Sequence, residues 1–366
     1  MKKKLVVLSL VAVLALYRCT PVIKDRTTVN FPYTFNCNDK ICLPINAFSP
    51  KDIIVADSLI IFIQKHEKNV IRIYDRQNYK LIGSLLSIGR GPNEIMLVPK
   101  IRQWKIVEDT VMLFVRSYPK SWMWINIKES LDSGKVIVGK EYNFLADRKK
   151  RDISLSAGLT FDIGGDSLIM MINPQQKDKL QRNPNPYFIY YDYNKSIYKD
   201  SLFVQNFALV EGMQPMLFSG PSSISDDHRI LVHAYFYMNC IDFFDLKTFS
   251  KKTILFSPDA QDYKKIIEKP SYRFKETCGT KDYVYILKDQ ANKGDSLIGS
   301  SICVFSWDAK PVCELRFDER INYFFVEDKS HELFAIDYDE KIWRYKMPIN
   351  TTKANKSSIE NGIHEH

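Results

Sequence analysis

The sequence predicts an all-β fold, a six-bladed β-propeller with four-stranded antiparallel blades, from three observations. Short runs of β-branched and aromatic residues alternate with Asp, Asn and Gly, which is typical of strands joined by tight turns. A turn marker recurs at steps of 52, 57, 61, 55 and 48 residues, at Asp57, Asp109, Asp166, Asp227, Asp282 and Ser330. A period of about 50 residues with about four strands per unit indicates propeller blades, because one such sheet cannot bury both of its faces alone.

The second run of each unit supports the same division. In the first five units it ends in an aromatic or apolar residue followed by a turn former: Tyr74-Asp75, Ile125-Asn126, Tyr191-Asp192, Phe244-Asp245 and Trp307-Asp308. The sixth unit shows only three clear strands, within residues 321–326, 332–337 and 341–347. Because a ring of blades must close, we predict that an N-terminal strand within residues 28–46 supplies the missing one. An ordinary β-sandwich is the alternative interpretation.

The first unit leaves its last strand through the run Ser87-Ile88-Gly89-Arg90-Gly91-Pro92-Asn93-Glu94. This run resembles the Gly-Arg-Gly-Pro-x-Glu signature of TolB-like six-bladed propeller lipoproteins of Gram-negative envelopes. The close match covers residues 53–94, and the rest of the chain matches by its layout. Asn93 departs from the family, which usually has Gly there. The resemblance implies a fold and a compartment, and it implies no reaction.

The first 18 residues are predicted to be a signal peptide. Three lysines precede an apolar run from Leu5 to Leu16, which is too short to span a bilayer as a helix. Cys19 follows closely, and Leu16-Tyr17-Arg18-Cys19 resembles a lipobox, in which the cysteine is acylated after cleavage. Tyr17 and Arg18 depart from the small residues usual there, so ordinary secretion is the alternative. We expect an outer-membrane lipoprotein that faces either the periplasm or the cell surface.

The expected domain organisation is a signal peptide at 1–18, a polar tether at 19–27, one propeller domain at 28–349 and a disordered tail at 350–366. The formal charge of +9 falls to +5 without residues 1–18, which carry four basic and no acidic residues. A basic run at residues 148–151 is interpreted as a solvated loop, and an anionic polymer or a lipid head group is its alternative partner. No basic-aromatic module indicates a nucleic-acid partner.

The sequence predicts no catalytic residue, no metal site and no cofactor. Gly89-Arg90-Gly91 lacks the Lys-Ser/Thr and the helix of a phosphate-binding loop. Asp226-Asp227-His228 is interpreted as a turn, because it lies where every unit places one. Trp122 and Trp124 lie two positions apart on one predicted strand, so their side chains are predicted to lie on the same face, at a buried blade interface. Cys37 and Cys42 could close a small loop, but buried free thiols are the prediction for most of the six cysteines after Cys19.

Two loops are the predicted binding sites. One is the signature turn, with Arg90, Asn93 and Glu94 as its candidate contacts. The other is the insertion at residues 210–225, where Met213, Met216, Leu217 and Phe218 are expected to be exposed and to form an apolar contact. Of these four, Met213, Met216 and Phe218 are the candidate ligand contacts. A strand crossing the core is the alternative for this insertion.

The function predicted from these observations is that of a non-enzymatic binding module. It would hold an envelope protein or a glycan through loops between blades and the mouth of the axis, and it would sit on the membrane through a lipid anchor at Cys19. The alternative is a propeller enzyme, a hydrolase or lyase, with its site at the central channel.

Overall fold

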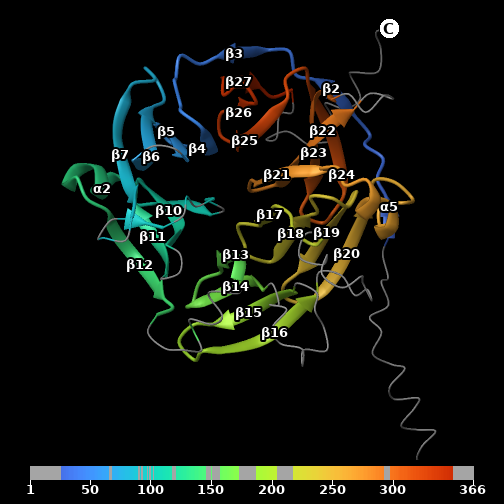
Figure 1. Cartoon of the computed structure of the whole chain (residues 1–366), viewed down its shortest axis with the longest axis horizontal. Helices are drawn as coiled ribbons and strands as arrows, with labels where there is room; N and C mark the ends of the chain where they lie inside the picture. The colour runs from blue at the N-terminus through green and yellow to red at the C-terminus, as the bar shows by residue number, and fades with distance from the viewer. Residues whose placement is uncertain are drawn as a thin grey trace, which may run out of the picture.

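The fold is a ring of six β-sheets around a central axis, as Figure 1 shows. It is seen in a computed structural model that describes residues 26–65, 68–89, 91, 94–96, 98, 100–101, 103–117, 121–145, 150, 157–172, 187–203, 217–291 and 297–348. Apart from N-terminal strands added at the outer edge of three sheets, the strands of each sheet follow one another outward in sequence order, which is the arrangement of propeller blades. The predicted six-bladed all-β fold is confirmed. The predicted signal peptide, Cys19 and the tail at 350–366 lie outside the described residues.

The first three blades contain the following elements. Blade 1 holds β4 (Pro50–Ala56), β5 (Leu59–Gln64), β6 (Asn69–Asp75), β7 (Leu81–Ile88) and the short β8 (Glu94–Ile95). Blade 2 holds β9 (Trp104–Val107), β10 (Thr110–Ser117), β11 (Ser121–Asn126), helix α2 (Ile127–Ser133) and β12 (Ile137–Asn143). Blade 3 holds β13 (Ala157–Asp162), β14 (Ser167–Ile172), β15 (Tyr187–Asp192) and β16 (Ile197–Phe203).

The last three blades take strands from both ends of the chain. Blade 4 holds β17 (Ser222–Ile224), β18 (Ile230–Ala234), β19 (Cys240–Asp245) and β20 (Ser250–Leu255), with β1 (Arg26–Thr28) at its edge. Helix α5 (Tyr263–Glu268) leads to blade 5, which holds β21 (Phe274–Gly279), β22 (Tyr283–Ala291), β23 (Leu297–Ser306), β24 (Pro311–Phe317) and the added β2 (Thr34–Asn36). Blade 6 holds β25 (Ile321–Glu327), β26 (Glu332–Asp337), β27 (Ile342–Lys346) and β3 (Lys40–Cys42).

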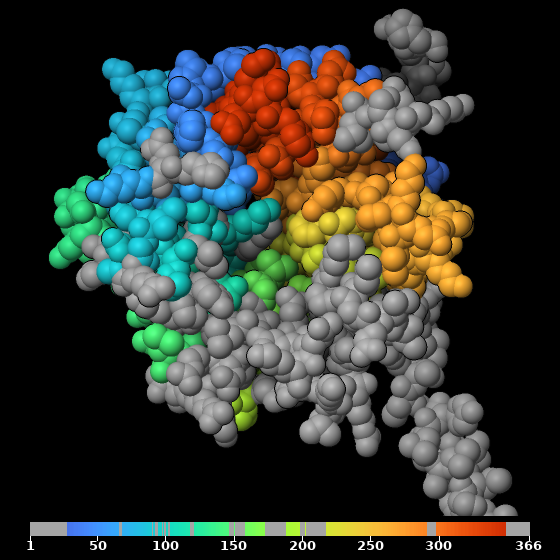
Figure 2. Space-filling model, in the orientation of Figure 1, coloured from blue at the N-terminus to red at the C-terminus, as the bar shows by residue number. Residues whose placement is uncertain are grey.

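The ring closes through β3, as predicted. This strand pairs antiparallel with β27 and completes blade 6, while the side chain of Lys40 forms an ion pair with Glu319. Before that, the N-terminal segment passes along the outer edges of blades 4 and 5, where β1 and β2 pair in parallel with β20 and β24. Figure 2 shows the blades packed side by side around the ring in sequence order. β1 begins at Arg26, inside the segment expected to be a tether.

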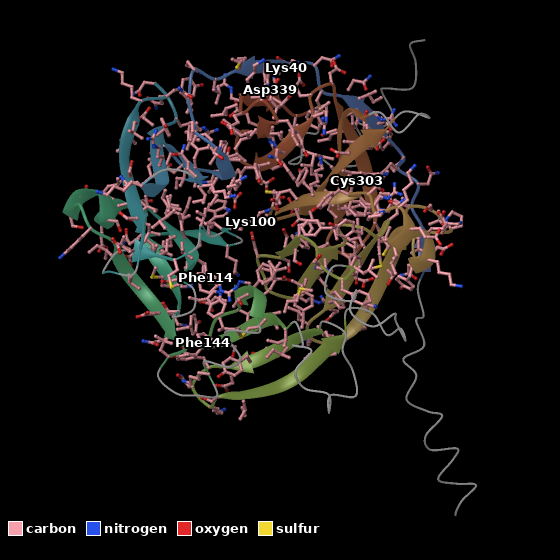
Figure 3. All side chains as sticks on the ribbon, in the orientation of Figure 1. Lys40, Lys100, Phe114, Phe144, Cys303 and Asp339 are labelled. Carbon is pink, nitrogen blue, oxygen red and sulfur yellow. The ribbon has the colours of Figure 1, made fainter. Side chains whose placement is uncertain are left out.

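Buried apolar side chains fill the interfaces between blades. Ile60, Ile61, Phe62 and Ile63 of β5 have no exposed surface, because a blade is covered on both of its faces. Trp122 and Trp124 are buried beside Phe144 and the tyrosines of blades 2 and 3, so the predicted blade interface is confirmed. Figure 3 shows Phe144 and Phe114 in this part of the ring.

The turn residues behave as their chemistry predicts. Asp57, Asp109 and Asp166 take the left-handed conformation, with φ between 54° and 58°, which Asp tolerates better than most residues. At the ends of β6 and β19 the carboxylate oxygens of Asp75 and Asp245 accept backbone hydrogen bonds at 2.8–2.9 Å from residues two and three positions later. These local bonds terminate strands at the spacing visible in the sequence.

The described cysteines are all free. Five are buried and Cys42 is exposed, and Cys303 is paired with Glu314 instead of Cys313 in the β23–β24 register. Burial raises the pKa of the Cys278 and Cys303 thiols to about 12, so they are protonated at neutral pH. No helix in the described ranges is long and apolar enough to cross a bilayer.

Candidate functional site

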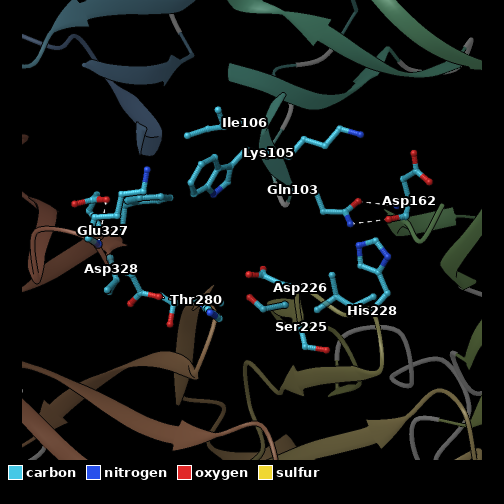
Figure 4. Close-up of a pocket in the computed structure, with 18 of the residues that line it drawn as sticks. Gln103, Lys105, Ile106, Asp162, Ser225, Asp226, His228, Thr280, Glu327 and Asp328 are labelled. Carbon is cyan, nitrogen blue, oxygen red and sulfur yellow. Dashed lines mark hydrogen bonds between the residues drawn. The ribbon is translucent and has the colours of Figure 1, made fainter. Parts of the chain in front are cut away.

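A pocket of about 660 Å³ lies at one end of the ring axis, where the innermost strands β9, β13, β17, β21 and β25 end. We call it the axial pocket, and Figure 4 shows many of the residues that line it. Blades 2 to 6 supply its lining residues, which come from sequence positions between 103 and 329. The turn markers that define the repeat lie at this same end, because each joins an innermost strand to its neighbour. The repeat therefore builds the rim of the pocket.

One side of the axial pocket is aromatic. Trp104 at the start of β9 is half-buried, and its ring lies 5.6 Å from that of Phe325 in blade 6. Trp124 is almost fully buried, and its indole Nε1 donates a 2.6 Å hydrogen bond to Asp162 Oδ2. The ammonium group of Lys105 lies 4.3 Å from the Trp124 ring centroid. These residues give the pocket an apolar surface with a cation beside it.

Gln103 and Asp162 fasten blade 2 to blade 3 beside the pocket. The Gln103 side chain donates to the Asp162 carbonyl at 2.9 Å and accepts from the Asp162 backbone N–H at 2.6 Å, as the dashed lines in Figure 4 show. The Asp162 carboxylate accepts from Trp124 and, at 2.9 Å, from the Gly164 N–H. This carboxylate is therefore engaged in holding the rim in place.

Of the other acidic residues in the lining, Asp226 of blade 4 and Asp328 of blade 6 are the candidate ligand contacts. Asp328 Oδ2 accepts a 3.1 Å hydrogen bond from the backbone N–H of Lys281. Burial raises the pKa of Asp328, and the nearby carboxylates of Asp282 and Asp226 act in the same direction. Within the described part of the chain, Asp226 makes no side-chain hydrogen bond or ion pair, and Figure 4 shows it near the centre of the pocket. These two carboxylates can accept hydrogen bonds from a ligand.

Asp226-Asp227-His228 forms a turn, as predicted, and this turn also lines the pocket. The Ser225 hydroxyl donates to Asp227 Oδ1 at 2.6 Å, which holds the pKa of Asp227 below its usual value. His228 takes a positive φ of 55°. The turn directs Asp226 and His228 into the axial pocket. The sequence pattern predicts the turn. It does not predict that the turn lies at the axis, because that position depends on how five blades meet.

The channel beneath the pocket is narrow, and its lining is partly polar and partly apolar. A space of about 50 Å³ lies there, and its lining includes Asp52 of blade 1 and Glu276 of blade 5. Lys100, from the connection between blades 1 and 2, forms a 2.9 Å ion pair with Glu276, whose side chain is 2% exposed. Figure 3 shows Lys100 near the centre of the ring. In the described residues, no group of three His, Cys, Asp or Glu side chains is arranged to hold a metal ion.

The predicted signature site is described only at Glu94. Its carboxylate accepts a 2.6 Å hydrogen bond from the Gly91 N–H and closes the turn on itself. A Cβ at Gly89 would lie 2.0 Å from Glu94 Oε2, so this position has no room for a side chain beside the carboxylate as placed. Arg90 and Asn93 lie outside the described residues, so their predicted ligand contacts stay predictions. Glu94 does not line the axial pocket.

The predicted apolar loop is described only at its end. Leu217 and Phe218 have no exposed surface, so their expected exposure is wrong. Phe218 packs in the core between blades 3 and 4, because burial of a large apolar ring stabilises the fold. Residues 217–218 are not part of a strand, so the alternative of a strand crossing the core is met in its burial and not in its secondary structure. Met213 and Met216 lie outside the described residues.

A buried Ser–His pair in blade 4 has a structural role. Ser222 Oγ lies 2.7 Å from His233 Nδ1, and His233 Nε2 lies 2.9 Å from the Phe218 carbonyl. Because a carbonyl only accepts, Nε2 carries the proton and Nδ1 accepts from Ser222. Neither side chain has exposed surface, so no substrate reaches the pair. Burial lowers the pKa of His233 to about 4.

Comparison with known proteins identifies no relative by sequence: no family model and no curated protein matches the chain. Among solved structures, the chain is similar to one from the Mitotic Checkpoint Complex, with a TM-score of 0.44 and 11% identity, covering 90% of this chain and 96% of that one. It is also similar to the β-propeller domain of Myceliophteria thermophila Cps50 (Swd1), with a TM-score of 0.47 and 9% identity, covering 85% and 99%. Likenesses of this degree assign neither a ligand nor an activity.

Proposed function

We propose that the protein is an exported, lipid-anchored β-propeller of the cell envelope that binds a glycan in its axial pocket without altering it chemically. The N-terminal features support export and anchoring: a charged start, a short apolar run and Cys19 in a lipobox-like context. The resemblance of residues 53–94 to TolB-like lipoproteins points to the same compartment. An envelope protein is the other partner that such a module would take.

The observation that carries the binding proposal is the composition of the axial pocket. Its volume of about 660 Å³ lies within the usual range for ligand sites, and it combines an aromatic side with carboxylates. A sugar ring offers apolar C–H faces that pack on Trp104 and hydroxyls that donate to carboxylates such as Asp226 and Asp328. The Asp162 carboxylate accepts hydrogen bonds from Trp124 and Gly164 and holds the rim in place. This structural use of the carboxylate favours ligand binding over catalysis.

Binding is tested with a panel of neutral, amino and acidic oligosaccharides, followed through tryptophan fluorescence of the purified protein. We expect one class to give a saturable change. Trp104→Ala should weaken it on the order of tenfold, the value of one aromatic contact, and Asp226→Asn should weaken it severalfold. Asp57→Asn is the matched control, because Asp57 occupies the corresponding turn of blade 1, which supplies no lining residue. Saturable binding of peptides alone would contradict the glycan assignment.

Location is tested by protease shaving of intact cells that carry the native protein or a Cys19→Ala variant. Shaving of the native protein and release of the variant support a surface lipoprotein. Protection until the outer membrane is opened supports a periplasmic one. Release of the native protein as a soluble species contradicts the anchor.

A hydrolase or lyase is the second candidate, and one observation favours it. Asp328, whose pKa is raised, faces the pocket near the carboxylate of Asp226, and such a pair can supply a general acid and a carboxylate. In that case, a bound oligosaccharide would be converted to product, and Asp328→Asn would abolish product formation while binding persists. An unchanged oligosaccharide after prolonged incubation excludes this candidate for the glycan tested.

A further inference from the structure

The face opposite the axial pocket carries a group of aromatic and basic side chains at blade 4, some exposed and some half-buried. Strand β17 ends at the pocket. Because successive strands of blade 4 are antiparallel, β18 and β20 run the other way and end at the opposite face. The loop after β18 and the segment after β20, which contains α5, therefore lie there. We define the α5 patch as Phe236, Tyr237, Lys269, Tyr272 and Arg273.

The α5 patch is a fixed structure with an amphipathic surface. Tyr272 is 56% exposed, and its ring lies 4.9 Å from Tyr237 and 5.7 Å from Phe236. The Arg273 N–H donates a 2.6 Å hydrogen bond to the Phe236 carbonyl, which joins the two segments. Residues 262–273 carry four basic and two acidic side chains. Tyrosine rings flanked by Lys and Arg suit the interface of an anionic bilayer, where the rings enter the head-group layer and the cations meet lipid phosphates.

The predicted anchor joins the ring at the outer edge of blade 4, the blade that carries this patch. Strand β1 pairs in parallel with β20, with Arg26 opposite Thr253 and Thr28 opposite Leu255, so the tether joins blade 4 two residues before the strand reaches the α5 face. Only seven residue steps separate Cys19 from Arg26, and a chain of that length spans at most about 24 Å. An acyl chain on Cys19 would therefore hold the blade 4 edge near the membrane surface.

We infer that the α5 patch rests on the phosphate-bearing head groups of the membrane, so that the axial pocket opens away from the bilayer. The inference rests on the proposed lipid anchor. It assigns the two faces of the ring to different partners: lipid on the α5 face, and the ligand on the pocket face. The anchor supplies attachment, and the patch fixes orientation, in accordance with the two signals that stable membrane association needs.

Site-directed quenching tests the orientation in the acylated protein, reconstituted in vesicles of phosphatidylethanolamine and phosphatidylglycerol. A Cys42→Ser background removes the exposed described thiol, since the other five described cysteines are buried. A fluorophore is attached at Ser271→Cys, next to Tyr272 of the patch, or at Ser133→Cys, the matched control in α2 on the pocket side of blade 2. Head-group nitroxide lipids should quench the probe at 271 several times more strongly than the probe at 133. Lys269→Ala with Arg273→Ala should lower quenching at 271 towards the control level.

Each outcome decides the inference. Vesicle flotation with selective quenching at 271, lost in the double variant, supports it. Flotation with equal quenching at both positions overturns the orientation and leaves the anchor standing. Absence of flotation overturns the anchor and the inference together. If the probe at position 271 becomes shielded only when envelope protein is added, the lipid assignment is overturned, because the patch would then be a protein contact.

Discussion

At the scale of single residues, His233 couples the stability of blade 4 to pH. Burial lowers its pKa to about 4, whereas an unfolded histidine titrates near 6.5. The unfolded state therefore binds more protons between these values, and the free energy of unfolding falls as pH drops from about 6.5 to 4, by about 3 kcal/mol in total. Chemical denaturation across this range measures the slope. His233→Gln should flatten it at a lower overall stability, and an unchanged slope in the variant would assign it to other groups.

Gln103 is a residue-scale test of the pocket rim. Gln103→Ala removes both partners of the Asp162 backbone groups, which are buried, so we expect a loss of about 2 kcal/mol from unmade hydrogen bonds. Thermal and urea unfolding measure it. Gln290→Ala is the control, because Gln290 makes one part-buried hydrogen bond inside blade 5 and should cost less. A larger loss at Gln290 would contradict the rim assignment.

At the scale of elements, the N-terminal strands differ in their importance. β3 is the fourth strand of blade 6, whereas β1 and β2 are fifth strands on blades that already have four. Deletion of β3 would leave the edge of β27 unpaired and would also remove the buried Leu43 and Ile45 if the chain started at Ala47. We expect that truncated chain to lack a cooperative thermal transition.

The matched control is a chain that starts at Asn38, which lacks β1 and β2 and keeps β3. It should fold with a lower melting temperature and a cooperative transition, measured by circular dichroism. If the chain starting at Ala47 melts as the full-length protein does, β3 is not the element that closes the ring.

At the scale of the whole molecule, the sequence predicts what is local in the chain. Asp57 and its counterparts mark turns through their own backbone chemistry, and repetition of that local signal is enough to predict six blades and the need for a closing strand. The axial pocket joins Trp104, Asp226 and Asp328, which are separated by about a hundred residues at each step, so no local pattern indicates it. The predicted exposure of Phe218 is wrong for a related reason. The composition of a loop does not show which of its side chains a neighbouring blade covers.

The channel also depends on contacts between distant blades, and Lys100 provides a test of the ring as a unit. Lys100→Met leaves the Glu276 carboxylate, which is 2% exposed, without its cation. The free energy of unfolding should therefore fall by about 1–3 kcal/mol. This figure is smaller than for a fully buried pair, because Lys100 is 38% exposed. Adding Glu276→Gln removes the charge and should recover most of the loss in urea unfolding. A double variant with no recovery would show that Lys100 contributes through packing instead of charge.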